Sequence, residues 1–462
     1  MTGAHNLDWR RWGAAALLIA YACEVALAHG VLKWALAAAL VLAPMLAWIL
    51  YAADAWLILF FAAALLAPPL PLNFGNSGPH PSLAFAALGL GVGVVRLNEW
   101  RFHRGLLEGA LVTFLAVLAI SVACAAIYSG EDVAIQSLAR VGLAGISIFV
   151  FFYVSAGPGR ATSISLQLLF WVALASASFA CLDFYFQFPA PAGFEAQYVW
   201  LASGIYRRAQ GLFYEASTLA NFCAFFLVMI AVALVRRVAN RPLLLSAGVV
   251  FASALIFSYS RAAVLGVGVA LTTLLLLERT HLAFRRLVWI VAGALAAGLA
   301  IVYQVFPRFA EAYWSRISYA ATNFSSSADR ILTGRVESWQ TLIGFLAENP
   351  WHAIFGVGYK TLPYSDFIGQ RVVSDNMYLS ALVETGIVGL GALLVLNFAI
   401  LRAGYTAARS SDSEKSFYGT WIFCFWTAQM VQMLSADVLT FWRVMPVYLW
   451  VLAMAVRKRV PL

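Results

Sequence analysis

The chain has 462 residues, of which 63% are hydrophobic and only 11% charged, and its mean hydropathy is +0.84. Soluble globular domains carry about 25% charged residues. The composition therefore excludes a cytosolic enzyme, a secreted disulfide-rich protein and a disordered protein. Long apolar stretches recur from one end to the other, which predicts an all-α polytopic membrane protein. The net charge of +9 has to be interpreted by the position of its basic residues.

The apolar runs predict about 12 to 14 membrane-spanning helices, because some runs are shorter than the ~20 residues that cross a bilayer. They lie at 12–29, 31–51, 55–67, 82–95, 106–128, 141–155, 163–186, 216–235, 243–258, 262–277, 287–306, 376–402, 417–436 and 439–456. This order predicts an N-terminal transmembrane bundle of about 11 spans at 1–306, a large loop at 307–375 and about three C-terminal spans at 376–462.

Short basic links define the orientation of the spans. Segments such as RLNEWRFHR at 96–104 and RRVANR at 236–241 fall on one side when the spans alternate. The positive-inside rule assigns that side, with both termini, to the cytoplasm. The loop at 307–375 and the shorter links at 68–81, 129–140 and 187–215 then lie outside. The basic balance reflects this topology and anionic headgroups, and no nucleic-acid partner is expected.

The sequence predicts no metal and no cofactor. The five cysteines and six histidines are scattered, without the spacing of a metal site or a disulfide framework. No phosphate-binding GxxxxGK[ST] motif occurs, and no inside link is long enough for a nucleotide-binding domain. Any chemistry is therefore expected at the outer face, without ATP or a nucleotide sugar.

Five arginines fall at the outer ends of apolar segments: Arg207, Arg208, Arg261, Arg335 and Arg443. Ionisable groups in such places cost free energy and are functional candidates. Because the guanidinium fork pairs bidentately with phosphate oxygens, a convergent set would suit a lipid diphosphate. Alternatively, each arginine merely extends to the headgroups.

Acidic residues at the same face also have two interpretations. Asp375, next to Asn376, precedes an apolar helix and is either a functional carboxylate or the helix N-cap. Glu215 stands in the same position before another helix. Carboxylates within apolar spans need a packing partner or a proton, and these are Glu24, Glu108 and Glu384.

In residues 329–347, DRILTGRVESWQTLIGFLA, the apolar residues recur at helical spacing and the charged residues lie off that face. This pattern predicts an amphipathic helix lying on or against the membrane domain. A Pro/Gly-marked turn follows at 348–359. Such a helix could form a lid over a site that opens toward lipid.

Four segments together resemble the O-antigen ligase and O-antigen polymerase superfamily of bacterial envelope glycosyltransferases. They are RAQGLFYEASTLANFCAFFL at 208–227, SYSRAAVLG at 258–266, GRVESWQTLIGFLAENPWHAIFGVGY at 334–359 and DNMYLSALVETGIVGLG at 375–391. The last is similar to a family signature in which a polar pair, nine residues and Gly-x-x-Gly follow one another. All four occur in order, with apolar spans after the long loop.

The resemblance implies a metal-independent, inverting transferase in the bacterial inner membrane, with its site facing the periplasm. Its donor would be a glycan linked to undecaprenyl diphosphate. Arg208, Arg261 and Arg335 match the diphosphate-binding arginines, whose role grows as charge develops on the leaving group. Asp375 occupies the position where ligases usually carry a histidine as general base, and an aspartate can accept a proton. Further substrate-binding candidates are Arg207, Glu215, Tyr259, Asn376 and Arg443.

Three alternatives remain at the level of function. The Asp375–Asn376 pair and Glu215 are more similar to polymerases of O-antigen or exopolysaccharide repeat units than to ligases, which use lipid A–core as acceptor. A lipid-linked oligosaccharide transporter would also be polytopic, although the sequence shows no inverted repeat. A scaffold for envelope-polysaccharide assembly proteins is the third alternative. Membrane lipids are expected partners in every case.

Overall fold

The computed structural model describes residues 54–70, 79–102, 104–157, 166–191, 193–201, 204–238, 240–278 and 335–457, with single helical positions between 293 and 318. The predicted spans at 12–29 and 31–51, and most of the span at 287–306, lie outside the described residues. So do Glu24 and residues 319–334 of the large loop.

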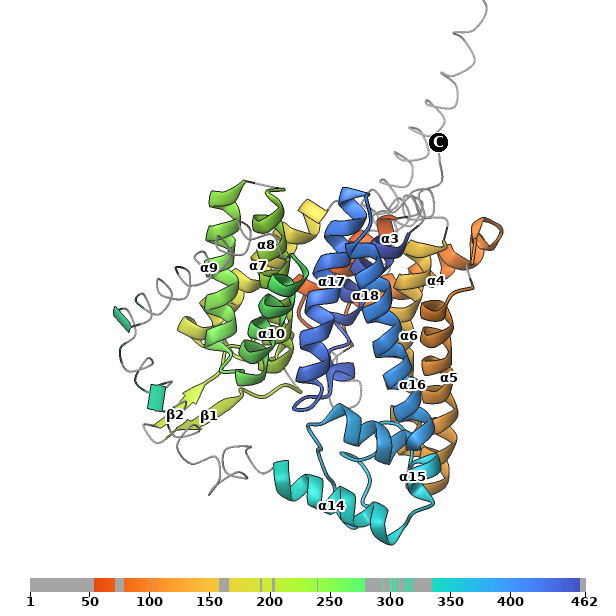
Figure 1. The fold of residues 1–462 in the computed structure, drawn as a ribbon. Helices are drawn as coiled ribbons and strands as arrows, with labels where there is room; N and C mark the ends of the chain where they lie inside the picture. The colour runs from red at the N-terminus through yellow and green to blue at the C-terminus, as the bar shows by residue number, and fades with distance from the viewer. Residues whose placement is uncertain are drawn as a thin grey trace, which may run out of the picture.

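The described segments are helical apart from one β-hairpin, and short turns connect most of them (Figure 1). The transmembrane part contains α3 (Ala55–Leu66), α4 (Ser82–Val95), α5 (Leu106–Ser129), α6 (Glu131–Ser155), α7 (Leu166–Phe186), α8 (Ala216–Arg236), α9 (Arg241–Phe257), α10 (Arg261–Leu277), α16 (Met377–Ala408), α17 (Ser413–Gln432) and α18 (Met445–Val456). The remaining elements are β1 (Tyr198–Leu201), β2 (Gly204–Arg207), α14 (Arg335–Glu348), α15 (His352–Phe355) and the 3₁₀ turns η1 (Leu97–Glu99), η2 (Gly211–Phe213) and η3 (Val438–Thr440).

This architecture confirms the predicted all-α polytopic membrane class. Within the described ranges, five helices are long and apolar enough to cross a bilayer: α5, α6, α7, α8 and α16. Five shorter apolar helices accompany them: α3, α4, α9, α10 and α18. Helix α17 is more polar, and it packs against α16, α10 and α18 rather than standing alone.

The prediction of an outer link at 129–140 is wrong. Helix α5 ends at Ser129, Gly130 makes the turn with φ of 87°, and α6 starts at once at Glu131. Glycine adopts this left-handed conformation without the steric cost that a side chain would add. The span predicted at 141–155 is therefore the second part of a 25-residue helix. As a result, Arg140 belongs to a helix rather than to a loop.

Two C-terminal spans also differ from their predicted bounds. The span predicted at 417–436 is α17, which begins at Ser413 because Asp412 accepts hydrogen bonds from the Glu414 and Lys415 amides. The span predicted at 439–456 begins as the turn η3, and α18 starts only at Met445. Residues 433–444, which include Asp437 and Arg443, are thereby left outside both helices.

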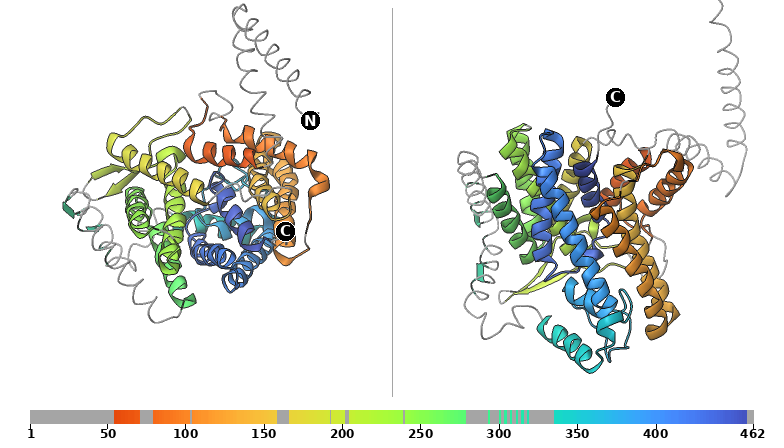
Figure 2. Two further views of the ribbon diagram at one scale, coloured as in Figure 1. Left: turned by 90° about the horizontal axis from the view of Figure 1, so that it is seen from above. Right: turned by 45° about the vertical axis from the view of Figure 1, so that its right-hand side comes forward.

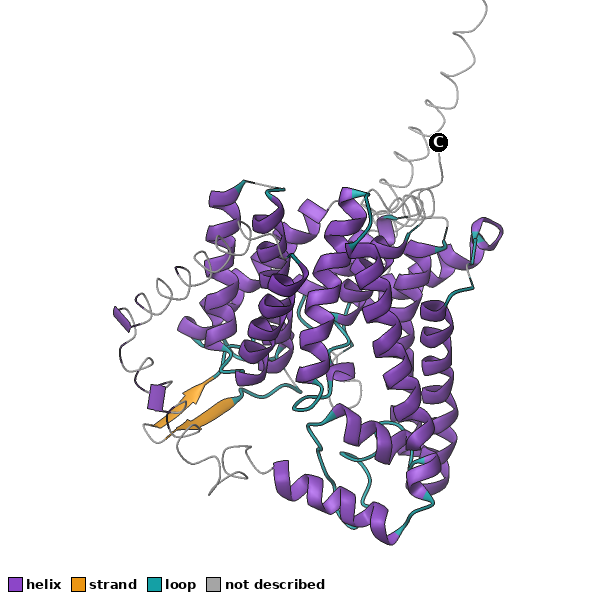
Figure 3. Cartoon of the chain, viewed as in Figure 1, coloured by secondary structure: helices purple, strands orange, loops and turns teal. Residues whose placement is uncertain are grey.

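The connections between the helices lie at the two opposite ends of the bundle. The β-hairpin, α14 and α15 lie at one end, together with the α9–α10 turn and the beginning of α16 (Figures 1 and 3). The α8–α9 and α16–α17 connections and the end of α18 lie at the other. The second end carries the basic links at 236–241 and 402–415. The views in Figure 2 show α16, α17 and α18 at the centre of this arrangement.

Helix α8 is the most buried of the five long apolar helices described above, and its aromatic residues pack against α17 and α18. The ring of Phe225 lies 4.3 Å from that of Trp421 and 4.4 Å from that of Tyr448. The Tyr448 hydroxyl donates to the Asn221 side-chain oxygen at 2.6 Å. Because lipid is as apolar as these side chains, close packing and such hydrogen bonds are what associate membrane helices. This core holds α8, α17 and α18 at fixed positions beside the site described next.

Candidate functional site

A buried aspartate organises the turn that carries Arg208. Asp183, on α7, accepts hydrogen bonds from the backbone N–H groups of Gln210 and Gly211, at 3.3 and 3.0 Å, and pairs with Arg207 at 3.4 Å. Gly211 has φ of 53°, and a Cβ there would approach the Ala180 Cβ to 2.8 Å. These contacts explain the spacing of Arg208 and Gly211 in the first motif.

The first two motifs contact each other directly. The Arg208 Nε donates to the Ser258 carbonyl at 2.7 Å. The Ala209 amide donates to the Phe257 carbonyl at 2.9 Å. The next residue, Tyr259, has φ of 55°, which reverses the chain before Arg261 starts α10. The turn bearing Arg208 and the hairpin bearing Arg261 are therefore one unit.

The third and fourth motifs interlock around a break in α16. The Val357 and Gly358 amides donate to the carbonyls of Val383 and Glu384, at 3.0 and 2.8 Å. At Gly386 φ is 70°, and a Cβ there would come within 2.0 Å of the Ile354 backbone oxygen. Only glycine permits this close approach of the loop to the helix. The glycines of both motifs thus serve the docking of the loop on α16.

Helix α14 (Arg335–Glu348) confirms the predicted amphipathic helix over the described part of 329–347. Its buried Leu342 packs with Val357, Leu362, Val372 and Val383 in a small apolar cluster. The indole N–H of Trp339 donates to the Ser374 carbonyl at 2.7 Å. These contacts fix α14 next to the chain that leads into α16, and they place Arg335, its first residue, beside Asp375.

A polar cavity of about 610 Å³ lies where these segments meet. This volume falls within the range of small-molecule and cofactor sites. Six of the nine candidate residues line it: Arg208, Glu215, Tyr259, Arg261, Arg335 and Asp375. They come from all four motif segments and are up to 167 positions apart in the sequence. The fold thus brings these six candidate residues together around one cavity.

Asp375 and Arg335 form an ion pair in the cavity wall. The Arg335 Nε lies 3.1 Å from the Asp375 Oδ2, and their side chains are 25% and 44% exposed. The alternative in which Asp375 caps α16 is wrong. Asn376 is the N-cap, since its side-chain oxygen accepts the Tyr378 and Leu379 amides, both at 3.1 Å. Asp375, with φ of 45°, is the residue before the cap, and its carboxylate belongs to the cavity.

Glu215 lies at the start of α8 without capping it. Its Oε2 accepts a hydrogen bond from the Thr218 hydroxyl at 2.6 Å. Burial raises the pKa of this carboxyl, and the Thr218 hydrogen bond and the charges of Arg208 and Lys360 oppose that rise. Burial likewise lowers the pKa of Arg208, with a smaller contribution from Arg335, while Glu215 acts in the opposite sense. Cationic side chains thus surround a partly buried carboxyl group.

Three of the candidate residues do not line the cavity. Arg207 points to Asp183 and to the Phe188 carbonyl. Asn376 caps α16 as described. Arg443, only 6% exposed, donates to the backbone carbonyls of Ala64, Ala67 and Leu212. These residues hold elements together rather than facing the same space as the other six.

The sequence analysis did not name several residues of the cavity as candidates. Arg140 of α6 donates to the Tyr364 hydroxyl at 2.7 Å. Lys360 donates to the Asp437 carboxylate. Glu384, which the sequence marked only as a carboxylate within a span, also lines the cavity and is 2% exposed. In the structure, buried Ala134, Ser137 and Val141 continue the inner face of α6 through the predicted link that contains Arg140.

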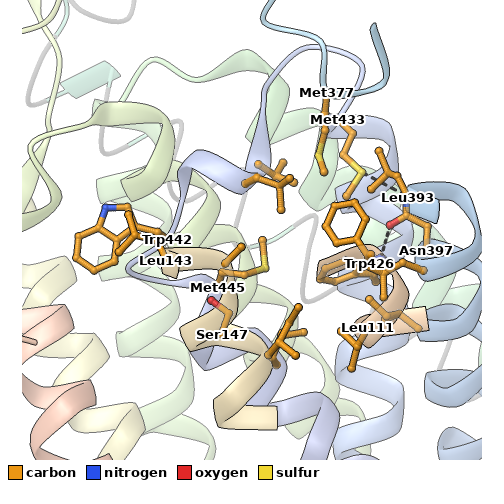
Figure 4. Close-up of a pocket in the computed structure, with 18 residues that line it drawn as sticks. Leu111, Leu143, Ser147, Met377, Leu393, Asn397, Trp426, Met433, Trp442 and Met445 are labelled. Atoms are coloured by element: carbon orange, nitrogen blue, oxygen red, sulfur yellow. Dashed lines mark hydrogen bonds between the residues drawn. The ribbon is translucent and has the colours of Figure 1, made fainter. Parts of the chain in front are cut away.

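A second pocket is apolar and lies between α5, α6, α16, α17 and α18 (Figure 4). Leu393, Trp426 and Trp442 are among the residues that line it. Its volume is about 40 Å³, which is too small for a lipid chain or a sugar. In the part of the chain that the structure describes, no cluster of three or more His, Cys, Asp or Glu side chains could hold a metal ion.

Comparison with known proteins gives one finding. No curated protein matches the chain. A family model described as O-antigen ligase matches residues 246–394. This segment includes Arg261, Arg335 and Asp375, whereas Arg208 and Glu215 precede it. The match supports the resemblance seen in the motifs: residues 246–394, which include three of the four motif segments, are similar to the O-antigen ligase family.

Proposed function

We propose that the protein is a metal-independent glycosyltransferase that moves a glycan from undecaprenyl diphosphate to an acceptor hydroxyl. The observation that carries this proposal is the convergence of Arg208, Arg261 and Arg335 with carboxylates in one cavity. Arginine holds diphosphate oxygens through paired N–H donors. The cavity also offers enough room for a diphosphate and the sugar attached to it.

The reaction changes the charge of two groups: the lipid diphosphate gains negative charge as it leaves, and the acceptor hydroxyl loses its proton. The acceptor oxygen attacks the anomeric carbon, the bond from that carbon to the diphosphate oxygen breaks, and the lipid diphosphate leaves with the electron pair. The three arginines stabilise the negative charge that develops on the leaving group. A carboxylate takes the proton of the acceptor hydroxyl. The family resemblance assigns this role to Asp375, in the position of the ligases' histidine.

The position of the cavity supports a periplasmic site in the bacterial inner membrane. The basic links at 236–241 and 402–415 lie at the opposite end of the bundle. By the positive-inside rule that end is cytoplasmic, as is the C-terminus that follows α18. The cavity, α14 and the hairpin then face the periplasm, where lipid-linked glycans are joined to their acceptors.

Polymerisation of O-antigen or exopolysaccharide repeat units is the favoured reaction. Asp375 and Asn376 replace the histidine pattern of ligases, and Glu215 follows the turn in a way similar to polymerases. Transfer to lipid A–core remains the second candidate, because the matched family model is described as O-antigen ligase. Envelope-polysaccharide assembly proteins are proposed partners in both cases. A transporter of lipid-linked oligosaccharides is the remaining alternative.

The test uses the full-length protein in detergent with a short undecaprenyl-diphosphate-linked repeat unit, with and without lipid A–core. Separation by size distinguishes the outcomes. A ladder of longer lipid-linked glycans from the single substrate supports a polymerase. Product that forms only with lipid A–core supports a ligase. Absence of product in both mixtures contradicts the transferase and favours a transporter or a scaffold.

A further inference from the structure

The four carboxylates that the structure describes in the cavity wall differ in what already binds them. Asp375 is paired with Arg335, and Asp437 with Lys360. Glu384 makes hydrogen bonds with the backbone of residues 360 and 362. Glu215 instead has hydroxyl partners, and none of the ion pairs among the described residues includes it.

We propose that Glu215 is the general base that takes the proton from the acceptor hydroxyl, and that Asp375 is a positioning residue for Arg335. This inference rests on the proposed transferase function. In the step, the proton moves from the acceptor oxygen to the Glu215 carboxylate as the new glycosidic bond forms. The bond to the diphosphate breaks on the opposite side of the anomeric carbon, and the leaving oxygen carries the electron pair.

The surroundings of Glu215 suit this role. It precedes α8 by one residue and shares the cavity with Arg208, seven positions earlier in the chain. In an inverting transfer the base takes the acceptor proton on the face of the sugar opposite the leaving group, so it must share the cavity with the diphosphate-binding arginines without forming an ion pair with one of them. The Thr218 hydroxyl donates to one carboxylate oxygen at 2.6 Å, which fixes the side chain and favours its ionised form.

The charged groups facing Glu215 also predict how substrate changes it. Burial raises the pKa of the carboxyl, while Arg208 from its own turn, Lys360 from the loop after α15, and the Thr218 and Ser217 hydroxyls lower it. A bound diphosphate would neutralise Arg208 and bring negative charge nearby. Both effects favour the protonated carboxyl and make the carboxylate a stronger base once donor is bound.

The experiment compares Glu215→Gln with Asp375→Asn in the full-length protein, using the lipid-linked repeat unit and a range of pH. Wild type should lose kcat as the pH falls through the raised pKa of Glu215, because the base must be ionised. Glu215→Gln should lower kcat by about 10²- to 10⁴-fold at nearly unchanged KM, and the acid limb should vanish. Added formate or azide should restore activity to Glu215→Ala but not to Asp375→Ala.

The opposite pattern overturns the inference. If Glu215→Gln keeps more than a tenth of the wild-type kcat, or if Asp375→Asn abolishes the acid limb, Asp375 is the base. Glu215→Asp, which keeps the charge, guards against a folding defect in the other variants and should retain the limb at reduced kcat. A wild type that forms no product refutes the transferase itself, which separates failure of the function from failure of this assignment.

Discussion

The ion pair between Arg335 and Asp375 provides a test of how the cavity is built. At 3.1 Å, two unit charges attract each other by about 5 kcal/mol at an effective dielectric constant of 20. Because the side chains are 25% and 44% exposed, solvent screens most of this energy. Measured values for exposed pairs are about 0.2 to 1 kcal/mol. Loss of the pair should therefore hardly change the thermal stability of the protein.

Activity should respond much more strongly than stability. Arg335→Ala removes a proposed donor to the leaving diphosphate, for which a loss of about 10²- to 10³-fold in kcat is expected. Asp375→Ala should cost less, because Arg335 remains and is only less well oriented. If Asp375 acts through Arg335, the double variant should be no slower than Arg335→Ala, so the two effects should not add.

The assay is a double-mutant cycle on initial rates of transfer, with thermal unfolding in detergent measured on the same four proteins. Additive losses of rate would refute the reasoning, since they would mean that Asp375 has a function of its own. A large drop in the unfolding temperature of either single variant would also contradict it, because the pair would then be structural. The cycle needs no knowledge of which sugars are transferred.

Further expectations concern neighbouring residues with different surroundings. Arg208→Lys should raise KM or lower kcat at least tenfold, because lysine lacks the paired N–H donors of arginine. Arg207 faces away from the cavity, so Arg207→Lys should mainly lower the unfolding temperature. Steady-state kinetics and thermal unfolding of both variants separate the two effects. Gly386→Ala should destabilise the folded protein by about 2 kcal/mol or more, because φ at Gly386 is 70° and the added Cβ would clash with backbone atoms. Gly391→Ala should be neutral, because a Cβ at Gly391 would have no atom within 4 Å. Thermal unfolding of both variants checks this. Arg443→Met should cost about 3 to 5 kcal/mol by leaving buried carbonyls without donors, with little change in KM, and a fully stable variant would contradict the contacts described.

The sequence predicted the fold class and most of the helices because apolar runs between basic or Pro/Gly-marked breaks have few other solutions in a membrane. It also predicted six residues of the cavity. Arg208, Arg261 and Arg335 were recognisable because a charged side chain at the end of an apolar helix costs free energy and is therefore a functional candidate, and because each lies in a motif. Their convergence could not be derived, since it depends on backbone contacts between motifs that spacing does not reveal.

The errors have local physical causes. Arg140 was hidden by a turn of only one glycine, since the polar residues after Gly130 suggested a link where the helix had already begun. Arg443 was placed with the phosphate-binding arginines by position, but its guanidinium binds the carbonyls at the end of α3. Sequence shows that a buried arginine needs acceptors. It does not show whether those acceptors belong to a ligand or to the backbone.

The charges of the cavity suit a site that both holds a leaving diphosphate and takes up a proton, as the proposed reaction requires. Among the described residues that line it, Arg140, Arg208, Arg261, Arg335 and Lys360 oppose the four carboxylates, so that the empty cavity is close to neutral. A near-neutral set is tolerated beside a membrane domain, where an excess of one sign would be costly. Diphosphate then tips the balance toward negative charge. In the proposed mechanism, the bound diphosphate occupies the arginines and strengthens Glu215 as the base, so proton uptake becomes favourable only when a leaving group is in place.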